Sequence, residues 1–257
     1  MAKIRERAPR FLPEWIRQRI EINVFHLFDF MERSGATYRP DDLVLDAGAG
    51  EGRFYDEFAH TRYIAIDLAI GDETWDYTRL DAVSELTEIP FAADTFDAVL
   101  CTQVLEHVPE PYLVLAELCR VLKPAGRLYL SCPQSWHQHQ KPHDYFRYTS
   151  FGLRYLLDKA GYEVTELTPM GGYFWFLSFQ LQNINYWIFP RGMRFRALTL
   201  PFRILFAFLF QLITPLIFFY LDSLDRIKDE TFGYVCIAEK RSARTEQTET
   251  TKQGSFE

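Results

Sequence analysis

The stretch that decides the fold is Leu43-Val44-Leu45-Asp46-Ala47-Gly48-Ala49-Gly50-Glu51-Gly52. Its first four residues form an apolar run after the turn at 39–42, which predicts a buried parallel strand. The glycines that follow allow positive φ angles and let the backbone approach a ligand without a Cβ clash. A short helix is expected near 54–58. The stretch therefore predicts a strand, a glycine turn and a helix, an arrangement suited to binding a nucleotide.

A second predicted strand, at 63–67, ends in Asp67, nineteen residues after Gly48. There a carboxylate can accept two hydrogen bonds from ribose hydroxyls. A dinucleotide fold would need the spacing GxGxxG, but position 53 is Arg53 and the spacing is GxGxG. A nicotinamide cofactor is therefore disfavoured. The alternative, a glycine turn that binds nothing, is disfavoured by the matching acid.

Beyond this unit, predicted strands continue to alternate with predicted helices. Strands are expected at 96–101, 127–131, 162–167 and 232–238, and helices from Pro13, at 111–122 and at 150–160, the last capped by Ser150. Such alternation predicts an α/β fold with a mostly parallel sheet and helices on both faces. An apolar helical insertion interrupts the pattern before the last strand.

The composition narrows the class of protein. With 48% hydrophobic and 25% charged residues, the 257-residue chain is globular. Its net charge of -7 argues against nucleic-acid binding. The four cysteines, Cys101, Cys119, Cys132 and Cys236, form no CxxC pair and predict buried free thiols. The N-terminus lacks the apolar stretch of a signal peptide, so we expect a cytoplasmic protein.

The glycine stretch closely resembles motif I, DxGxGxG, of the class I S-adenosylmethionine-dependent methyltransferases, through Asp46, Gly48, Gly50 and Gly52. Residues 80–111, 118–133 and 144–164 are similar to further segments of the family, the last to bacterial type 11-like enzymes on small or lipid-linked acceptors. The resemblance implies an enzyme with S-adenosylmethionine as its cofactor and a Rossmann-like seven-stranded, mostly parallel sheet. It does not imply the acceptor.

The resemblance also implies which residues hold the cofactor. In the glycine loop, Gly48 and Gly50 would line the methionine part, with Ala49 and Gly52 beside them. Asp46 would face the cofactor's amino group, because an amine is a donor and a carboxylate an acceptor.

Residues farther along the chain would complete the cofactor site: Asp67, Leu68, Asp81, Ala82, Thr102 and Gln103. Asp67 would hold the ribose. Asp81 would accept from the adenine amino group and Ala82 would donate its backbone N–H, although Asp81 also fits a surface acid. Thr102 and Gln103 would border the sulfonium.

The acceptor side needs a base only if the acceptor is a weak acid such as a hydroxyl. The loop SWHQHQKPHDY at 135–145 follows a strand and is expected to cover an acceptor. Within it, His143 next to Asp144 is the candidate base, and a solvated loop is the alternative. His107 is a weaker catalytic candidate, expected mainly to order its own loop.

The same loop raises the question of a metal. His137, His139 and His143 offer three imidazole nitrogens. Because no carboxylate or cysteine completes the set, we expect no metal site.

The segment from Leu167 to Leu221 contains no Asp, Glu or Lys, and its only charged residues are Arg191, Arg194, Arg196 and Arg203. Within it, 204–221 is uncharged, at the lower length limit of a spanning helix. A single span would separate the last strand from its sheet, so a re-entrant hairpin or an in-plane amphipathic pair is expected. The arginines favour anionic lipid, and interfacial residue types occur at Trp175, Tyr186, Trp187 and Tyr220. The alternative is a lid, core or dimer surface in water.

We therefore predict an N-terminal helical segment at 1–40, a methyltransferase domain at 41–170 and 230–240, a membrane-associated insertion at 171–229 and a disordered tail at 241–257. The predicted function is O-directed methyl transfer to a lipid-linked or hydrophobic acceptor, by a peripheral or monotopic protein at the inner membrane face. A lipid-linked saccharide is favoured over a prenyl-tailed quinone ring. The alternatives are a soluble small-molecule enzyme with an aromatic lid and a catalytically idle, membrane-attached scaffold.

Overall fold

The computed structural model describes residues 12–71, 74–184, 188 and 193–242. The basic N-terminal residues, Tyr186, Trp187, Arg191 and most of the expected disordered tail lie outside the described residues. The chain divides into two compact units. One comprises Met1–Leu27 and Pro169–Phe232 and is called the helical unit, and the other comprises Phe28–Thr168 and Gly233–Glu257 and is called the sheet unit.

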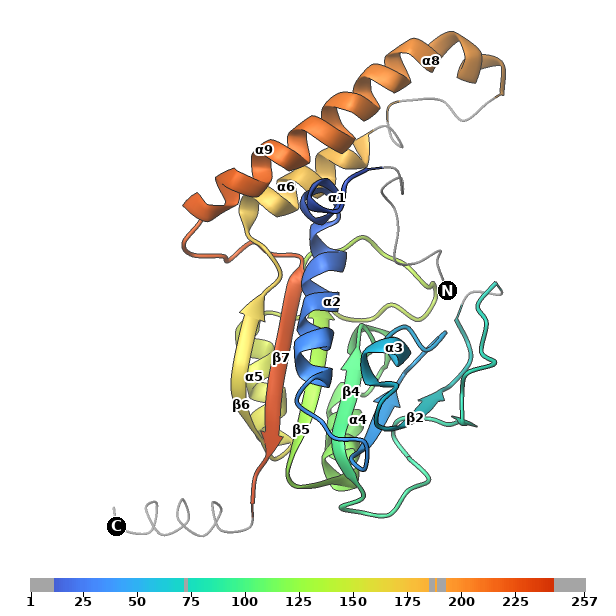
Figure 1. The fold of residues 1–257 in the computed structure, drawn as a ribbon, viewed down its shortest axis with the longest axis vertical. Coiled ribbons are helices and arrows are strands. Elements are labelled where there is room, and N and C mark those ends of the chain that lie inside the picture. Colours follow the sequence, from blue (N-terminus) through green and yellow to red (C-terminus); the bar gives the residue numbers. More distant parts are fainter. Residues whose placement is uncertain (1–11, 72–73, 185–187, 189–192, 243–257) are drawn as a thin grey trace. The chain divides into compact units, whose positions relative to one another are not determined.

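The sheet unit is built on a seven-stranded sheet of order β3-β2-β1-β4-β5-β7-β6 (Figure 1). Its strands are β1 (Leu43–Ala47), β2 (Arg62–Asp67), β3 (Ala82–Val83), β4 (Phe96–Thr102), β5 (Leu122–Pro133), β6 (Tyr162–Pro169) and β7 (Gly233–Lys240). The pairs from β3 to β5 are parallel, and β7 runs antiparallel to β5. The seven-stranded, mostly parallel sheet implied by the sequence is confirmed.

The strand register brings three strand ends to one edge of the sheet. Asp46 of β1 lies opposite Ala65 of β2 and Leu100 of β4. Asp67 lies two residues beyond Ala65, and Thr102 lies two residues beyond Leu100. Both are therefore at the carboxyl ends of their strands, next to the end of β1. In open α/β sheets ligands bind at this edge, beside the point where the strand order reverses.

Helices cover both faces of the sheet (Figure 1). One face packs against α4 (Pro111–Val121) and α5 (Ser150–Lys159), with Val99 and Leu130 of the sheet and Leu115 and Leu157 of the helices completely buried. The other face packs against α3 (Tyr55–Phe58) and against the part of α2 (Ile22–Gly35) that belongs to the sheet unit. The four cysteines are free and buried, as expected.

Two local features differ from the sequence-based expectation. The cap of α5 is Thr149 rather than Ser150, because the Thr149 hydroxyl accepts from the backbone N–H of Gly152 at 3.1 Å. The helical pattern that starts at Pro13 is split into α1 (Glu14–Ile20) and α2, with a break at Glu21. Such boundaries depend on single hydrogen bonds that a periodicity does not reveal.

The helical unit consists of α1, α6 (Tyr173–Gln182) and a rod formed by α8 (Met193–Ala207), the π-helix η2 (Phe208–Ile213), α9 (Thr214–Leu221) and the 3₁₀ turn η3 (Asp222–Leu224). The π-helical turn lies just before Pro215, which has no N–H to continue the α-helical pattern. Within this turn, the Thr214 hydroxyl donates to the carbonyl of Leu209, five residues back, at 2.9 Å.

Because the rod is continuous, a hairpin within 204–221 is wrong. In the part of the chain that the structure describes, one helix is long and apolar enough to cross a membrane, Thr199–Leu224, with 26 residues. Only 6% of its most apolar stretch is buried. A core helix of a water-soluble domain would be mostly covered, so this exposure needs an explanation.

Candidate active site

The glycine loop after β1 has the geometry that its sequence predicts. Gly48, Gly50 and Gly52 adopt φ angles of 83°, 55° and 69°, which disfavour any residue with a Cβ. The N–H groups of Gly48 and Ala49 both donate to the carbonyl of Ile66, at 2.9 and 3.0 Å. A Cβ at Gly48 would lie 2.5 Å from Cγ2 of Val104. The loop thus turns tightly against the residues that follow β4.

Asp67 faces this loop. Its Oδ2 accepts from the N–H of Gly50 at 2.9 Å, and its Oδ1 accepts from the N–H of Ala69 at 2.7 Å. Each carboxylate oxygen has a further lone pair for a ribose hydroxyl. The side chain of Leu68, the neighbouring residue assigned to the cofactor, is exposed.

Asp46 is the buried acid beneath the loop. Tyr63 donates its hydroxyl to Oδ2 of Asp46, whereas Oδ1 has no hydrogen-bond partner among the described residues. Burial raises the pKa of Asp46 to about 7, against the opposing effect of the Tyr63 hydrogen bond. A buried acceptor without a donor is rare in folded proteins. The free oxygen therefore fits a cofactor amine, bound directly or through water.

Asp81 has a different contact from the one its assignment implies. Its Oδ2 accepts from the N–H of Ala65 at 2.8 Å, and its own N–H donates to the carbonyl of Ala65 at 2.9 Å. These bonds hold the start of β3 beside β2, with Ala82 opposite Ile66. The adenine roles of Asp81 and Ala82 therefore remain predictions.

The segment between β2 and β3 supplies residues that the sequence reasoning missed. A Cβ at Gly50 would lie 3.1 Å from Cζ3 of Trp75, and one at Gly52 would lie 3.3 Å from Cδ of Arg79. The N–H of Asp76 donates to Oε1 of Glu51 at 3.0 Å. Two signals were available in the sequence. Residues 75–79 are aromatic and basic in character, and the segment that contains them begins at the carboxyl end of β2.

The end of β4 lies beside the glycine loop, as Val104 shows. Gln103 adopts a positive φ of 55°, unusual for a residue other than glycine. Its N–H donates to the carbonyl of Ser131 at 2.9 Å, and its Nε2 donates to Oγ of Ser131 at 3.1 Å. Strained residues of this kind occur often at functional sites. The assignment of Thr102 and Gln103 to the sulfonium remains a prediction.

The histidine-containing loop after β5 docks on the turn that follows β4. The N–H of Tyr145 donates to the carbonyl of Glu106 at 2.8 Å, and the Tyr148 hydroxyl donates to the carbonyl of Leu105 at 2.7 Å. Both carbonyls belong to the turn η1 (Leu105–His107). The loop therefore lies at the carboxyl ends of β4 and β5, where an acceptor would approach the cofactor.

The residues of the predicted base have other partners. Asp144 forms a bidentate ion pair with Arg147, at 2.6 and 2.9 Å, and Arg147 holds the pKa of this carboxyl well below its usual range. The ring of His143 lies 3.3 Å from the hydroxyl of Tyr145. The structure thus pairs Asp144 with Arg147 instead of orienting His143, and the role of His143 as a base stays a prediction.

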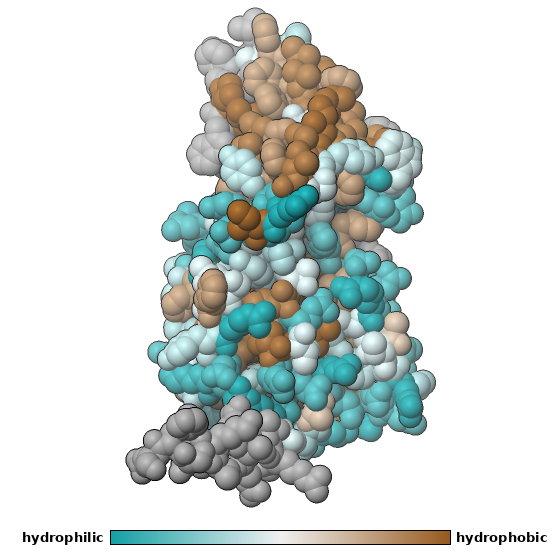
Figure 2. Space-filling view, turned by 90° about the vertical axis from the view of Figure 1, so that its left-hand side faces the viewer, coloured by the Kyte–Doolittle hydropathy of each residue, from teal (hydrophilic) through white to brown (hydrophobic). Residues whose placement is uncertain are grey.

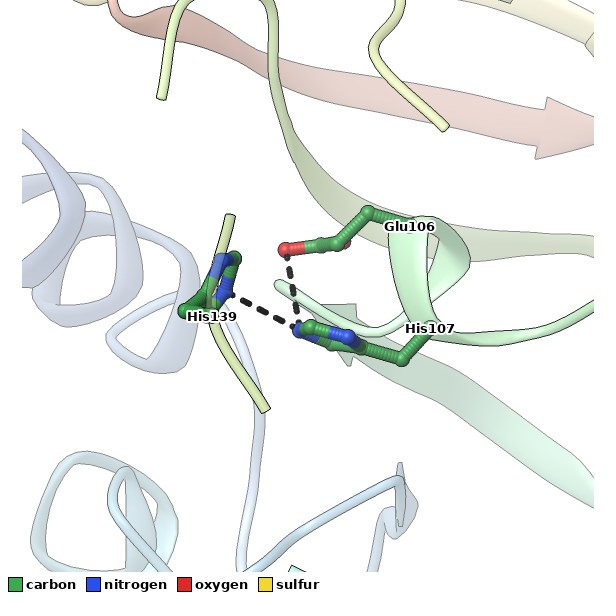
Figure 3. Close-up of side chains that lie close together, drawn as sticks. All are labelled: Glu106, His107 and His139. Atoms are coloured by element: carbon green, nitrogen blue, oxygen red, sulfur yellow. Dashed lines mark hydrogen bonds and ion pairs between the residues drawn. The ribbon is translucent and has the colours of Figure 1, made fainter. Parts of the chain in front are cut away.

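His107 meets His139 at the same edge. Their Nε2 atoms lie 3.1 Å apart, and Oε1 of Glu106 lies 3.8 Å from Nε2 of His107 (Figure 3). The ligand-type atoms of the three residues all lie within 4.8 Å of one another. Sequence reasoning grouped His139 with His137 and His143 and missed Glu106, although its place beside His107 was the available signal.

The comparisons with known proteins agree with this geometry. Residues 45–130 match the family model described as a methyltransferase domain. The match contains the glycine loop, Asp67 and the turn η1. The match and the sheet order identify residues 45–130 as a methyltransferase domain of the class I fold, for which S-adenosylmethionine is the cofactor.

Among curated relatives, the chain is 30% identical over 121 residues to the ubiquinone biosynthesis O-methyltransferase of Yersinia enterocolitica, covering 43% of this chain and 49% of that protein. It is 34% identical over 101 residues to the Xanthomonas oryzae protein of the same name, covering 34% and 41%. The chain thus matches about half or less of each relative's length. Among solved structures, the [4+2]-cyclase SpnF has the same fold, with a TM-score of 0.52 and 16% identity over 86% of this chain and 82% of that one.

Proposed function

We propose that the protein transfers the methyl group of S-adenosylmethionine to a hydroxyl oxygen of a hydrophobic, lipid-tailed acceptor at the cytoplasmic membrane surface. The observation that carries this proposal is the coexistence, in one chain, of a methyltransferase domain and the exposed apolar helix Thr199–Leu224.

The cofactor half of the proposal rests on the sheet unit. The glycine loop offers bare backbone, Asp67 offers acceptors for the ribose, and Asp46 offers an unpartnered oxygen for the amine. Methyl transfer from a sulfonium needs mainly that donor and acceptor are held in line at near-attack distance. The residues after β4 and the loop after β5 would then position the acceptor.

The membrane half rests on the exposed side chains of the rod, which Figure 2 shows as a concentration of hydrophobic surface. Its large exposed hydrophobic residues are Leu200, Phe202, Ile204, Leu205, Phe208, Leu209, Ile217, Tyr220 and Leu224. Monomeric soluble proteins rarely expose so many neighbouring apolar side chains. A helix lying in the bilayer interface would cover them and leave both of its ends on one side.

The interior of the helical unit supports an in-plane arrangement. Trp175 of α6 stacks on Phe219 of α9 with ring centroids 5.6 Å apart, and Arg19 of α1 lies 4.8 Å from the Phe219 ring centroid. The rod therefore has one face packed on α6 and α1, and another that is free to contact lipid. A helix crossing a bilayer alone would have no such internal partners.

The chemistry of the acceptor is supported by the relatives. The two relatives compared above carry the name of an O-methyltransferase of ubiquinone biosynthesis, and ubiquinone is lipid-tailed. This supports a prenyl-tailed quinone precursor over the lipid-linked saccharide favoured from the sequence.

Flotation on vesicles of phosphatidylethanolamine and phosphatidylglycerol tests the membrane half. We expect the full chain to float, and the triple variant Phe202→Asp, Leu205→Asp, Phe208→Asp to stay in the aqueous fraction. Phe151→Asp is the matched control, because Phe151 is 83% exposed on α5 and lies outside the rod. A wild-type protein that remains wholly aqueous would favour the soluble enzyme with an aromatic lid.

Transfer of radiolabelled methyl groups tests the chemistry. A prenyl-tailed catechol in vesicles, its tail-free counterpart and a lipid-linked saccharide form the acceptor panel. We expect wild type to prefer the tailed catechol, and the triple variant to lose that preference while keeping the same rate on the tail-free acceptor. Absence of label on every acceptor, with cofactor binding intact, would favour the catalytically idle scaffold.

A further inference from the structure

We propose that Glu106, His107 and His139 together bind one divalent transition-metal ion, with Zn²⁺ the best chemical fit, at the carboxyl end of β4. This differs from the sequence-based expectation of no metal. Two imidazoles and one carboxylate form a recurrent ligand set for catalytic zinc. The binding proposal rests on these three side chains alone and does not depend on the acceptor.

Two of the three separations between ligand atoms are close to those around a single ion, and the third is at most 4.8 Å. An ion about 2.1 Å from each ligand, in tetrahedral geometry, separates neighbouring ligand atoms by about 3.4 Å. The Nε2 atoms of His107 and His139 are 3.1 Å apart, and Oε1 of Glu106 is 3.8 Å from Nε2 of His107. The three side chains point toward one another from η1 and from the loop after β5 (Figure 3). Small rotations of the side chains would centre an ion among them.

The hydrogen bond at Nδ1 of each histidine ring determines what its Nε2 presents to the other two side chains. Nδ1 of His107 bonds the backbone carbonyl of His143, and Nδ1 of His139 lies 3.2 Å from the carbonyl of His137. Carbonyl oxygens only accept, so a neutral ring that donates through Nδ1 presents a lone pair at Nε2. Two lone pairs at this distance repel unless a cation lies between them. Metal-binding histidines are commonly oriented by the same kind of Nδ1–H bond.

Glu106 provides an independent observation. Its side chain is completely buried, and neither carboxylate oxygen has a hydrogen-bond partner among the described residues. An unpaired buried carboxylate is costly, and buried charges are normally paired or bound to metal. The charge of Arg147 favours the ionised form of Glu106. However, Arg147 is already paired with both oxygens of Asp144. A divalent ion would supply the missing partner of Glu106.

Three protein ligands leave one coordination position open, as in catalytic rather than structural zinc sites. This position lies by the end of β4, where Val104 touches the glycine loop. On the proposed function, the open position would bind the acceptor hydroxyl and lower its pKa, so that its proton passes to water. The oxygen then attacks the methyl carbon. The O–CH₃ bond forms, the S–CH₃ bond breaks with its electrons on sulfur, and S-adenosylhomocysteine leaves.

The test uses the full chain, stripped with EDTA and titrated with Zn²⁺ by calorimetry and with Co²⁺ by visible absorption. We expect one ion per chain, and a Co²⁺ spectrum typical of four or five ligands. Glu106→Gln and His139→Ala should each weaken binding by about a hundredfold or more, since each removes a direct ligand. His137→Ala is the matched control, because it removes a histidine of the same loop from outside the cluster.

Cofactor binding, measured in parallel, shows that each variant is folded. No bound metal in wild type, or equal metal binding in wild type and the two ligand variants, would overturn the proposal, and a shared proton would then explain the close histidines. Loss of binding in His137→Ala alone would also overturn it, in favour of a different histidine set. Because metal binding is measured without an acceptor, a failed methyl-transfer assay would count against the proposed function and not against this site.

Discussion

The backbone N–H of Gly50 donates to Oδ2 of Asp67 at 2.9 Å, so the glycine loop after β1 and the acid that ends β2 are in direct contact. This contact places a bare peptide surface and a carboxylate side by side at the carboxyl ends of β1 and β2. S-adenosylmethionine needs both, because its ribose hydroxyls are donors and its sulfonium chain must pass close to the backbone.

The glycine loop gives the first prediction. Gly48→Arg should abolish binding of S-adenosylmethionine, because its Cβ would lie 2.5 Å from Val104 and its φ of 83° is strained for any side chain. We expect at least a hundredfold rise in Kd by calorimetry, equivalent to about 2.7 kcal/mol. Gly152→Ala on α5 is the control, because its φ is not positive and its Cβ would make ordinary contact. Full binding by Gly48→Arg would refute the cofactor assignment.

The pKa of Asp46 predicts how cofactor binding depends on pH. Burial raises this pKa to about 7, and the cofactor's ammonium favours the ionised carboxylate. Affinity should therefore fall as pH drops below 7, by up to about tenfold per pH unit. Calorimetry between pH 5.5 and 8 measures the slope. Asp46→Asn should remove it, and Tyr63→Phe should move it to higher pH, because the Tyr63 hydrogen bond lowers the pKa of Asp46. A flat wild-type profile would contradict the assignment.

The same shift predicts the stability of the cofactor-free protein. The folded pKa of Asp46 is above the unfolded value of about 3.9. Its contribution to the free energy of unfolding is therefore complete below pH 4 and is lost as pH rises through 7. Asp46→Asn should raise the melting temperature at pH 8 relative to wild type and change it little at pH 4. Equal shifts at both pH values would show that titration is not the cause.

The helical unit gives a stability prediction. Asp222 accepts from the N–H groups of Gly172 and Trp175 at the start of α6, at 3.1 and 3.2 Å, and pairs with Lys228. Asp222→Ala should cost about 1–3 kcal/mol, because it leaves buried N–H groups without an acceptor. Thermal unfolding followed by circular dichroism measures the loss. Ser223→Ala, at an exposed neighbour, should have little effect, and an equal effect of both variants would contradict the capping role.

The loop after β5 gives a kinetic prediction. Arg147→Lys replaces the bidentate pair with Asp144 by a single contact, which should loosen the loop that docks on η1. Because Arg147 holds the pKa of Asp144 low, the wild-type pair should persist down to pH 4. We expect a rise of about tenfold in the acceptor KM with an unchanged cofactor Kd. Arg154→Lys on α5 is the control. A KM change in the control alone would exclude the loop as the cause.

Much of the site was predictable because its signals are local in the chain. The apolar run before Asp46 predicts β1, and three glycines in alternate positions predict a turn with positive φ, which the structure has. Asp67 could be placed because parallel strands bring their carboxyl ends to one edge. In contrast, β3 has only two residues, Ala82 and Val83, and is too short for a periodicity to reveal.

Other features depend on residues that are far apart in sequence. His107 and His139 are separated by 32 positions, and no spacing rule links them. Likewise, Arg19 bonds the hydroxyl of Tyr220 at 3.3 Å across the helical unit, although the sequence suggested that the N-terminal helix was a separate segment. The sequence also suggested that Asp144 orients its neighbour His143, whereas the structure pairs Asp144 with Arg147. Adjacency in sequence is a weak guide to the direction of a side chain.

The sequence by itself determined the sheet, the glycine loop and the apolar character of the segment before the last strand, because strand pattern, φ preference and hydropathy are properties of short stretches. Only the tertiary structure decided that the apolar segment forms one continuous rod, and that the ligand-type atoms of Glu106, His107 and His139 lie within 4.8 Å of one another. Those outcomes depend on which strand ends and loops become neighbours, and that follows from burial across the whole unit and not from any single stretch.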